Sequence, residues 1–205
     1  MKHKSMTILY RVHNNLYVNL TNRCPCACTF CLRSTRDEME QSGTLWLEHE
    51  PSVSEVKEEF SKFDLDQYEE IVFCGFGEPT ERLYDLLELA KFVKETYHKP
   101  IRLNTNGLTD LMYEKDTTPL FAGLIDTISI SLNTPSPEKF LELTRSKFGL
   151  KSFDAMLTFA KNVTRFVDKV VLTTVATTLS NEEEAQCQKI CDNIGVTYRI
   201  RAWED

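Results

Sequence analysis

The chain has 205 residues, 41% of them hydrophobic, so it can bury a full core, and we expect one domain over residues 1–205. A formal net charge of −7 argues against a general nucleic-acid binder or a protein of anionic membrane surfaces, which usually carry a basic stripe. The chain starts without an apolar signal segment, and no window reaches about eighteen consecutive apolar residues. The sequence therefore predicts a cytoplasmic protein with no membrane partner.

Hydrophobic periodicity switches repeatedly between strand and helix spacing along the chain. The expected strands are residues 7–12, 16–21, 69–75, 101–107, 126–133, 169–176 and 197–203. The expected helices are residues 52–63, 81–97, 119–124, a segment from 136 onward, 152–167 and 181–195. Capping-box spacing at Ser52 and Glu55, and again at Ser180 and Glu183, starts two of these helices. The first two strands form a hairpin, and the later alternation predicts βαβ units with a mostly parallel sheet.

Polar residues alternate with apolar ones along the strands, whereas strands of a sheet covered on both faces are usually apolar throughout. The polar positions are Tyr17, Asn19, Thr21, Arg102, Asn104, Asn106, Ser129, Ser131, Asn133, Thr197, Arg199 and Arg201. Helices must cover the apolar faces. Because ligand sites of α/β proteins gather at the carboxyl ends of strands, we favour a polar barrel interior that holds a ligand over a plain solvent face.

Seven cysteines, an odd number, include four within residues 24–31, which in a reducing compartment indicates metal or catalytic chemistry rather than disulfides. If all four bound one ion, the pattern would lack the two separated pairs of ordinary zinc sites. Cys24, Cys28 and Cys31 alone give C-x3-C-x2-C. Three thiolates would leave one iron of a 4Fe-4S cluster open to a small molecule. That interpretation leaves out Cys26.

These residues resemble the radical S-adenosylmethionine (radical SAM) superfamily, whose motif is C-x3-C-x-aromatic-C with the aromatic position filled here by Phe30. A second motif, similar to G-G-E-P, follows the next principal strand as Gly75, Phe76, Gly77, Glu78 and Pro79, with Phe76 in the second position. The two motifs occur in the order that the family requires, and the likeness covers nearly the whole chain.

The resemblance implies a partial (β/α)6 barrel of the TIM type with an N-terminal β-hairpin extension. It implies one 4Fe-4S cluster held by the three cysteines, and S-adenosylmethionine bound near the glycine-rich motif and near polar strand ends, where Asn104, Ser131 and Asn133 lie. Reductive cleavage of S-adenosylmethionine would give a 5′-deoxyadenosyl radical for hydrogen abstraction from an unidentified substrate. Reduced flavodoxin or ferredoxin is the expected electron donor.

Within the superfamily, residues 15–33 and 45–51 are most similar to short TatD-associated radical SAM proteins, which suggests association with a TatD-like hydrolase. Two alternatives remain open: a glycyl-radical-activase-like protein that acts on a partner protein, and a non-catalytic zinc or thiol module. No general base or hydrogen donor can be assigned; Tyr17, Asn19 and Arg201 are candidates by position only.

The remaining features have simpler interpretations. Cys74, Cys187 and Cys191 are expected to pack in the core. Arg199 and Arg201 either bind a substrate carboxylate or phosphate or form salt bridges at the rim. The long polar segment 32–51 is interpreted as a lid or substrate loop, with a surface insertion as the alternative.

Overall fold

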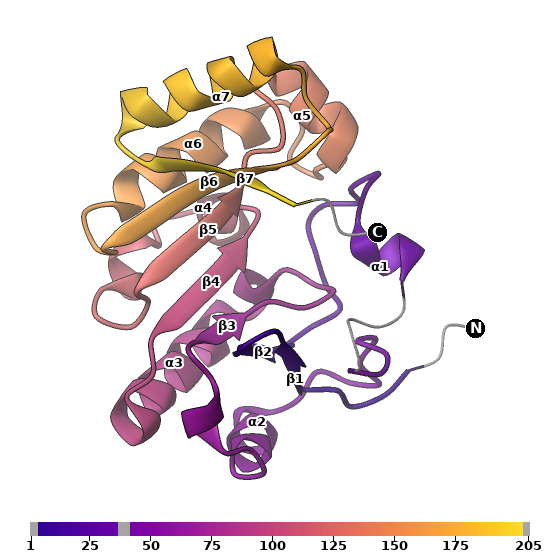
Figure 1. The fold of residues 1–205 in the computed structure, drawn as a ribbon, viewed down its shortest axis with the longest axis vertical. Coiled ribbons are helices and arrows are strands. Elements are labelled where there is room, and N and C mark those ends of the chain that lie inside the picture. The colour runs from indigo at the N-terminus through magenta and orange to yellow at the C-terminus, as the bar shows by residue number, and fades with distance from the viewer. Residues whose placement is uncertain (1–3, 37–41, 203–205) are drawn as a thin grey trace. The chain divides into compact units, whose positions relative to one another are not determined.

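The computed structural model describes residues 4–36 and 42–202, which form two compact units (Figure 1). The first unit is built from the chain up to Cys24, residues 30–104 and residues 124–126. The second unit is built from residues 25–29, residues 105–123 and the chain from Thr127 onward. The expectation of a single domain stays a prediction.

The first unit contains the N-terminal hairpin and the first parallel strands. Strands β1 (Leu9–Val12) and β2 (Asn15–Val18) pair antiparallel, and β2, β3 (Ile71–Phe73) and β4 (Ile101–Thr105) pair parallel in that order. Leu16, Ile71 and Ile101 are neighbours in register, and all three are fully buried. Apolar burial on this shared face is what aligns the strands.

Two helices supply the apolar packing of the first unit, α2 (Val53–Phe60) and α3 (Leu83–Tyr97). They meet through an aromatic group in which the Phe60 and Tyr97 ring centroids lie 5.9 Å apart and Phe92 and Tyr97 lie edge to face at 5.6 Å. The buried face of α3 is Leu83, Leu86, Leu89, Ala90 and Val93.

The second unit contains three more parallel strands, β5 (Thr127–Ser131), β6 (Lys169–Val175) and β7 (Thr197–Arg201), in the order β5-β6-β7. Its main helices are α5 (Pro137–Thr144), α6 (Lys151–Val163) and α7 (Asn181–Ile194). Edge-to-face aromatic pairs fill the core, with Phe121 and Phe159 at 5.9 Å and Phe140 and Phe153 at 5.6 Å.

Short elements complete the described chain. They are α1 (Leu32–Thr35), η1 (Leu65–Gln67), η2 (Pro79–Arg82), α4 (Thr109–Tyr113) and η3 (Thr118–Phe121). Every strand expected from the sequence is present, and the α/β class with parallel strands and an N-terminal hairpin is confirmed. Helix α4 was not predicted, and the helix expected at residues 152–167 ends earlier, at Val163.

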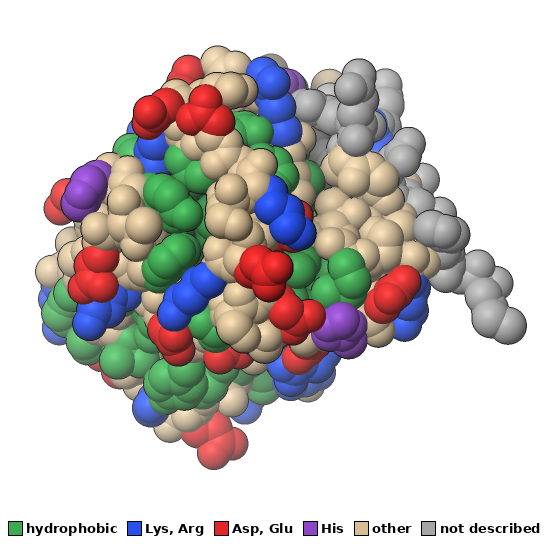
Figure 2. Space-filling view, turned by 90° about the horizontal axis from the view of Figure 1, so that it is seen from below, with side chains coloured by type: hydrophobic (Ala, Val, Ile, Leu, Met, Phe, Trp, Pro, Cys, Tyr) green, Lys and Arg blue, Asp and Glu red, His purple; other side chains and the backbone are tan. Residues whose placement is uncertain are grey.

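Charged side chains of both signs are interspersed on the face drawn in Figure 2. Among residues 4–36 and 42–202, none of the helices combines the length and the apolar character that a membrane crossing requires.

Both predicted capping boxes are present, and the one at α7 provides a test of the fold. The backbone N–H of Glu183 donates to Ser180 Oγ at 3.3 Å, and the backbone N–H of Ser180 donates to Glu183 Oε2 at 2.9 Å. We expect Ser180→Ala to lower the free energy of unfolding by about 1 kcal/mol, because the Glu183 N–H at the helix start loses its acceptor, Ser180 Oγ. Urea unfolding followed by circular dichroism measures this. Ser180→Asp, which preserves a capping oxygen, should stay within about 0.5 kcal/mol of the parent; equal losses in both variants would contradict the interpretation.

Candidate cofactor site

The segment that enters the cysteine loop is fixed by hydrogen bonds to residues 44–50, within the first unit. The Asn22 side chain donates to the Leu47 carbonyl at 2.8 Å and accepts from the Leu47 N–H at 3.0 Å. The Asn19 side chain donates to the Leu45 carbonyl at 2.8 Å. The two amide side chains thus provide hydrogen-bond partners for backbone groups of Leu45 and Leu47, as a neighbouring strand would.

Charged groups reinforce the same contact. Arg23 Nε and Nη2 donate to the two carboxylate oxygens of Glu50 at 2.7 and 3.0 Å, and the Thr21 hydroxyl donates to Glu50 as well. A two-pronged arginine–carboxylate pair fixes orientation as well as distance. Leu45 and Leu47 are 1% and 0% exposed. Residues 44–47 therefore pack into the core, whereas residues 48–50 are exposed, and this corrects the interpretation of residues 44–47 as part of a lid. Residues 37–41 lie outside the described residues.

The glycine-rich motif forms the loop between β3 and η2 and packs directly on the chain that leads to Cys24. The Glu78 N–H donates to the Arg23 carbonyl at 2.8 Å. A Cβ added to Gly77 would lie 2.2 Å from the Thr21 carbonyl oxygen and 2.6 Å from that of Arg23. Gly77 is therefore required by backbone packing between the two motifs. This packing could not be predicted from the sequence.

Gly75 and Phe76 hold the same loop by different means. A Cβ at Gly75 would lie 2.2 Å from Asn19 Oδ1, so this position also has no room for a side chain. Phe76, 7% exposed, packs in a cluster with Tyr10, Leu45 and Trp46, and its ring lies 5.3 Å from the Trp46 ring. The phenylalanine at the second motif position is therefore an apolar anchor for the loop.

Glu78 is buried, with 5% of its surface exposed, and its Oε1 is held by Thr80. The Thr80 N–H and hydroxyl donate to this oxygen at 3.2 and 2.7 Å, so Glu78 is the N-cap of η2. Both bonds stabilise the ionised carboxylate. An anionic acceptor at this loop is suited to an ammonium group.

The middle of the cysteine loop belongs to the second unit, where backbone bonds fasten it to the end of α5. The Ala27 and Thr29 N–H groups donate to the Thr144 and Leu143 carbonyls, each at 2.9 Å, and the Lys147 N–H donates to the Pro25 carbonyl at 3.0 Å. The Leu143 and Thr144 carbonyls lie in the last turn of α5, where helix carbonyls have no partner within the helix. No local sequence pattern predicts this contact, because α5 is more than a hundred residues away in the chain.

Burial separates the seven cysteines into two groups. Cys24, Cys28 and Cys31 are half-buried, whereas Cys26 is 5% exposed and Cys187 and Cys191 are fully buried. Burial raises the pKa of Cys187 to about 11 and that of Cys191 to about 12, which keeps both thiols protonated. The core interpretation of these two is confirmed; Cys74 is only half-buried.

The half-buried thiols of Cys24, Cys28 and Cys31 are the kind of donor set that an iron–sulfur cluster uses. Among residues 4–36 and 42–202, no three cysteine, histidine or acidic side chains already stand together as a metal site. Cys24 and Cys31 belong to the first unit, and Cys28 belongs to the second.

The polar candidates at the strand ends divide between the units. Asn104, in the first unit, accepts from Arg102 Nη1 at 3.3 Å. Ser131 and Asn133 lie in the second unit, at and just beyond the end of β5. Asn133 is 6% exposed and has a left-handed backbone with φ 63°, and its Oδ1 accepts no hydrogen bond from the residues that the structure describes. A buried carbonyl oxygen in this state is suited to a ligand that donates a hydrogen bond.

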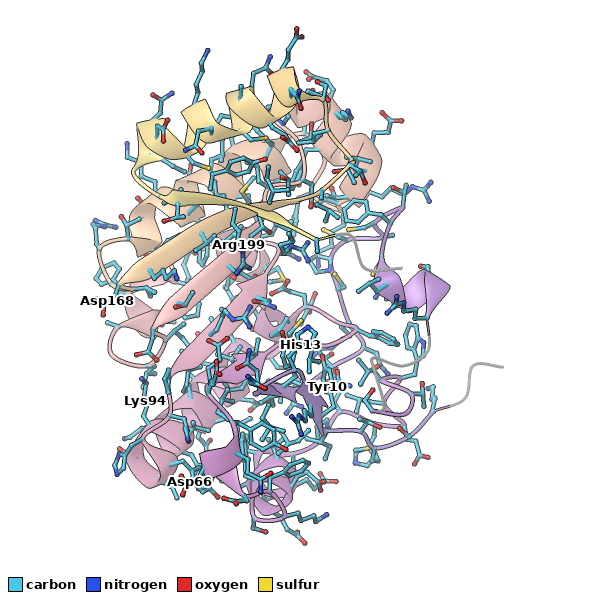
Figure 3. All side chains as sticks on the ribbon, in the orientation of Figure 1. Tyr10, His13, Asp66, Lys94, Asp168 and Arg199 are labelled. Atoms are coloured by element: carbon cyan, nitrogen blue, oxygen red, sulfur yellow. The ribbon has the colours of Figure 1, made fainter. Side chains whose placement is uncertain are left out.

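A hollow in the second unit lies at the opposite strand ends. Its lining includes Val167, Asp168, Lys169, Gly195 and Thr197, at the starts of β6 and β7 (Figure 3). Because ligand sites of open α/β sheets gather at the carboxyl ends of strands, this hollow is not the candidate site.

The fold and the motif loops define an α/β protein in which a cysteine loop and a glycine-rich loop follow the first two parallel strands. Residues 18–194 match the model of the radical SAM superfamily. The chain therefore belongs to the radical SAM superfamily, and it is a radical SAM enzyme. Members of this superfamily use a 4Fe-4S cluster and S-adenosylmethionine.

Two relatives are similar in sequence. The probable GTP 3′,8-cyclase of Saccharolobus islandicus is 28% identical over 186 residues, 89% of this chain and 54% of the relative. The GTP 3′,8-cyclase of Streptomyces coelicolor is 32% identical over 140 residues, 66% of this chain and 37% of the relative. The chain thus spans about half the length of the first relative and less of the second.

Solved structures share the fold at lower identity. Streptococcus suis SuiB bound to S-adenosylmethionine matches with a TM-score of 0.68 and 20% identity over 94% of this chain and 43% of SuiB. TYW1 with a lysine-pyruvate adduct matches with a TM-score of 0.65 and 14% identity over 94% of this chain and 66% of TYW1. These matches confirm the radical SAM type of α/β fold.

The packing of Gly77 on Thr21 and Arg23 predicts that a methyl group there is not tolerated. We expect Gly77→Ala to lower the free energy of unfolding by about 1–3 kcal/mol, because the neighbouring atoms are backbone and must shift. Gly123 has no atom within 4 Å of an added Cβ but has φ +70°, so Gly123→Ala should cost only about 1 kcal/mol, through its backbone conformation. Thermal and urea unfolding of both variants check the difference; equal losses would show that the junction is not tightly packed.

The burial of the thiols predicts an order of alkylation in the protein without metal. At a pH of about 8, iodoacetamide should modify Cys24, Cys28 and Cys31 well before Cys187 and Cys191, because only an accessible thiolate reacts. Peptide mass spectrometry over a time course measures the order. In urea all seven should react at similar rates, and fast labelling of Cys187 in the native protein would contradict its burial.

Proposed function

We propose that Cys24, Cys28 and Cys31 hold the 4Fe-4S cluster and that the enzyme cleaves S-adenosylmethionine reductively to abstract hydrogen from a substrate. We further assign cofactor contacts to Phe30, to the motif Gly75–Pro79 and to Asn104, Ser131 and Asn133. When bound, the cluster supplies one electron to the sulfonium, which breaks the S–C5′ bond and gives methionine and a 5′-deoxyadenosyl radical.

The observation that carries this proposal is the direct packing of the two motif loops. The N–H of Glu78 is bonded to the Arg23 carbonyl at 2.8 Å, one residue before Cys24. A group held by the cysteine loop and a group held by the glycine-rich loop would therefore be fixed relative to one another by short, buried backbone contacts. Such preorganisation is what a reaction between two bound cofactors requires.

The residues would have separate roles. Glu78 would accept hydrogen bonds from the ammonium group of the methionine part, in an orientation set by Thr80. Asn133 Oδ1 would accept from a ribose hydroxyl, which would satisfy its empty hydrogen-bonding capacity. Phe30, which is 37% exposed, would cover the cluster from water.

The substrate and partners are proposals as well. The two relatives above are named GTP 3′,8-cyclases, so GTP is the first small molecule to test. The likeness to TatD-associated members, the cytoplasmic location and an electron donor of the flavodoxin or ferredoxin type remain our predictions. An activase-like action on a partner protein is the second candidate, because that class shares the same cofactor chemistry. The non-catalytic zinc or thiol module is wrong, because the chain belongs to an enzyme family.

The experiment is release of 5′-deoxyadenosine by anaerobically reconstituted, chemically reduced protein. We expect Cys28→Ala to abolish release, because the cluster loses one of three ligands. Cys26→Ala should retain at least about half of the parent activity, since this buried side chain lies outside the ligand spacing.

A second readout does not depend on turnover. Cluster loading should protect Cys24, Cys28 and Cys31 from alkylation. Equal loss of iron and activity in Cys26→Ala and Cys28→Ala would overturn the ligand assignment. A fully loaded protein that releases no 5′-deoxyadenosine, alone or with GTP, would count against the proposed reaction.

A further inference from the structure

We infer that Arg199 and Arg201 on β7 bind an oxyanion of the substrate, a phosphate or a carboxylate. The inference deepens the proposed function and rests on it, because it names the substrate class of the same enzyme. Both arginines belong to the second unit. Neither the family match nor the named relatives assign a role to these arginines.

Strand register places these side chains on one face. Ser131 pairs with Thr173, and Thr173 pairs with Arg199, so a row of two hydroxyls and a guanidinium crosses β5, β6 and β7 near their carboxyl ends. Arg201 is one step further along the same face of β7, beside Val175. The carboxyl ends of parallel strands are where α/β proteins bind ligands.

Arg199 reaches across this face toward β5 (Figure 3). Its Nη2 lies 3.5 Å from the Ser129 hydroxyl, two strands away, which places the guanidinium above β6. Ser129 precedes Ser131 by two residues and shares its face. The guanidinium is therefore next to the hydroxyl row rather than extended into solvent beyond the edge strand.

Arg201 supplies the second observation. Its Nε is buried and has no hydrogen-bond partner in the described part of the chain. Buried guanidinium N–H groups are normally paired, because an unpaired one is costly. An oxyanion is the partner that matches the fork of a guanidinium best, since it accepts two parallel hydrogen bonds.

The charge on this face is of one sign, although the whole chain is acidic. None of the residues of β5, β6 and β7 is Asp or Glu, and the strands carry Lys169, Arg199 and Arg201. Thr173 Oγ1 already donates to the Ile130 carbonyl at 3.3 Å, so the arginines are the donors on which the proposed site depends.

Calorimetry on the cluster-loaded protein with S-adenosylmethionine tests the inference, with inorganic pyrophosphate and citrate as probes. The wild type should bind at least one probe with a dissociation constant of about 1 mM or tighter. Arg199→Gln/Arg201→Gln should weaken that binding at least about tenfold, because charge-assisted hydrogen bonds are lost. Arg199→Lys/Arg201→Lys should be intermediate, since it keeps the charge but loses the fork. Preference for pyrophosphate would indicate a phosphate substrate, and preference for citrate a carboxylate.

The matched control is Arg165→Gln. Arg165 belongs to the same unit, its side chain is 60% exposed, and it pairs with Asp116. It should bind both probes like the wild type, and circular dichroism melting should show that every variant is folded. Equal weakening in Arg165→Gln, or no probe binding to the wild type at about 10 mM, would overturn the inference.

The affinity for S-adenosylmethionine and the release of 5′-deoxyadenosine without substrate should not change in the Gln variant. A weaker S-adenosylmethionine affinity would assign the arginines to the cofactor and overturn the inference. Failure of the proposed function would look different from failure of this inference. In that case the wild type itself would release no 5′-deoxyadenosine, whether or not the probes bind.

Discussion

The close packing of the glycine-rich loop on the chain before Cys24 is the contact on which the first unit's site depends. Gly77 leaves no space between its Cα and two backbone carbonyls, and the Glu78 N–H uses one of these carbonyls as its acceptor. Arg82, just beyond the motif, extends the contact, since its Nη1 donates to the Leu20 and Pro51 carbonyls at 3.0 and 2.5 Å. Backbone carbonyls cannot move unless the surrounding chain moves with them, so the junction is stiff.

Polar side chains on the strand faces are of two kinds. In the first unit, Arg102 donates to Glu70 at 2.8–2.9 Å and approaches the Tyr17 hydroxyl at 3.5 Å. Burial raises the pKa of Tyr17, so the hydroxyl stays protonated, and the network is complete within the protein. Asn133 Oδ1 and Arg201 Nε in the second unit, like Asn15 Oδ1 and Asn19 Oδ1 in the first, are buried and have no hydrogen-bond partner among the described residues. Asn133 and Arg201 lie at the carboxyl ends of parallel strands, where such atoms are suited to a ligand.

The features that could be predicted from the sequence are those that depend on neighbouring residues in the chain. Strand alternation, both capping boxes and the two motif loops could be placed, because each follows from residues close together in the chain. Periodicity alone does not decide between Leu87 and Leu89 of α3, because both fit a wide apolar stripe. Tertiary packing buries Leu89 and leaves Leu87 only half-buried. The burial of residues 44–47 could not be predicted, because it depends on contacts of Asn19 and Asn22 across a gap of more than twenty residues.

The phenylalanine in the glycine-rich motif shows why such long-range contacts matter for function. From the sequence, Phe76 is only a departure from the family pattern. In the structure it packs with Trp46 and Leu45, the same segment that Asn19 and Asn22 bind from the other side. Residues 44–50 therefore hold both the strand before Cys24 and the loop before Glu78. The bulky side chain strengthens the junction through apolar burial, while Gly75 and Gly77 keep the tight backbone contact, so the departure is compatible with the same cofactor chemistry.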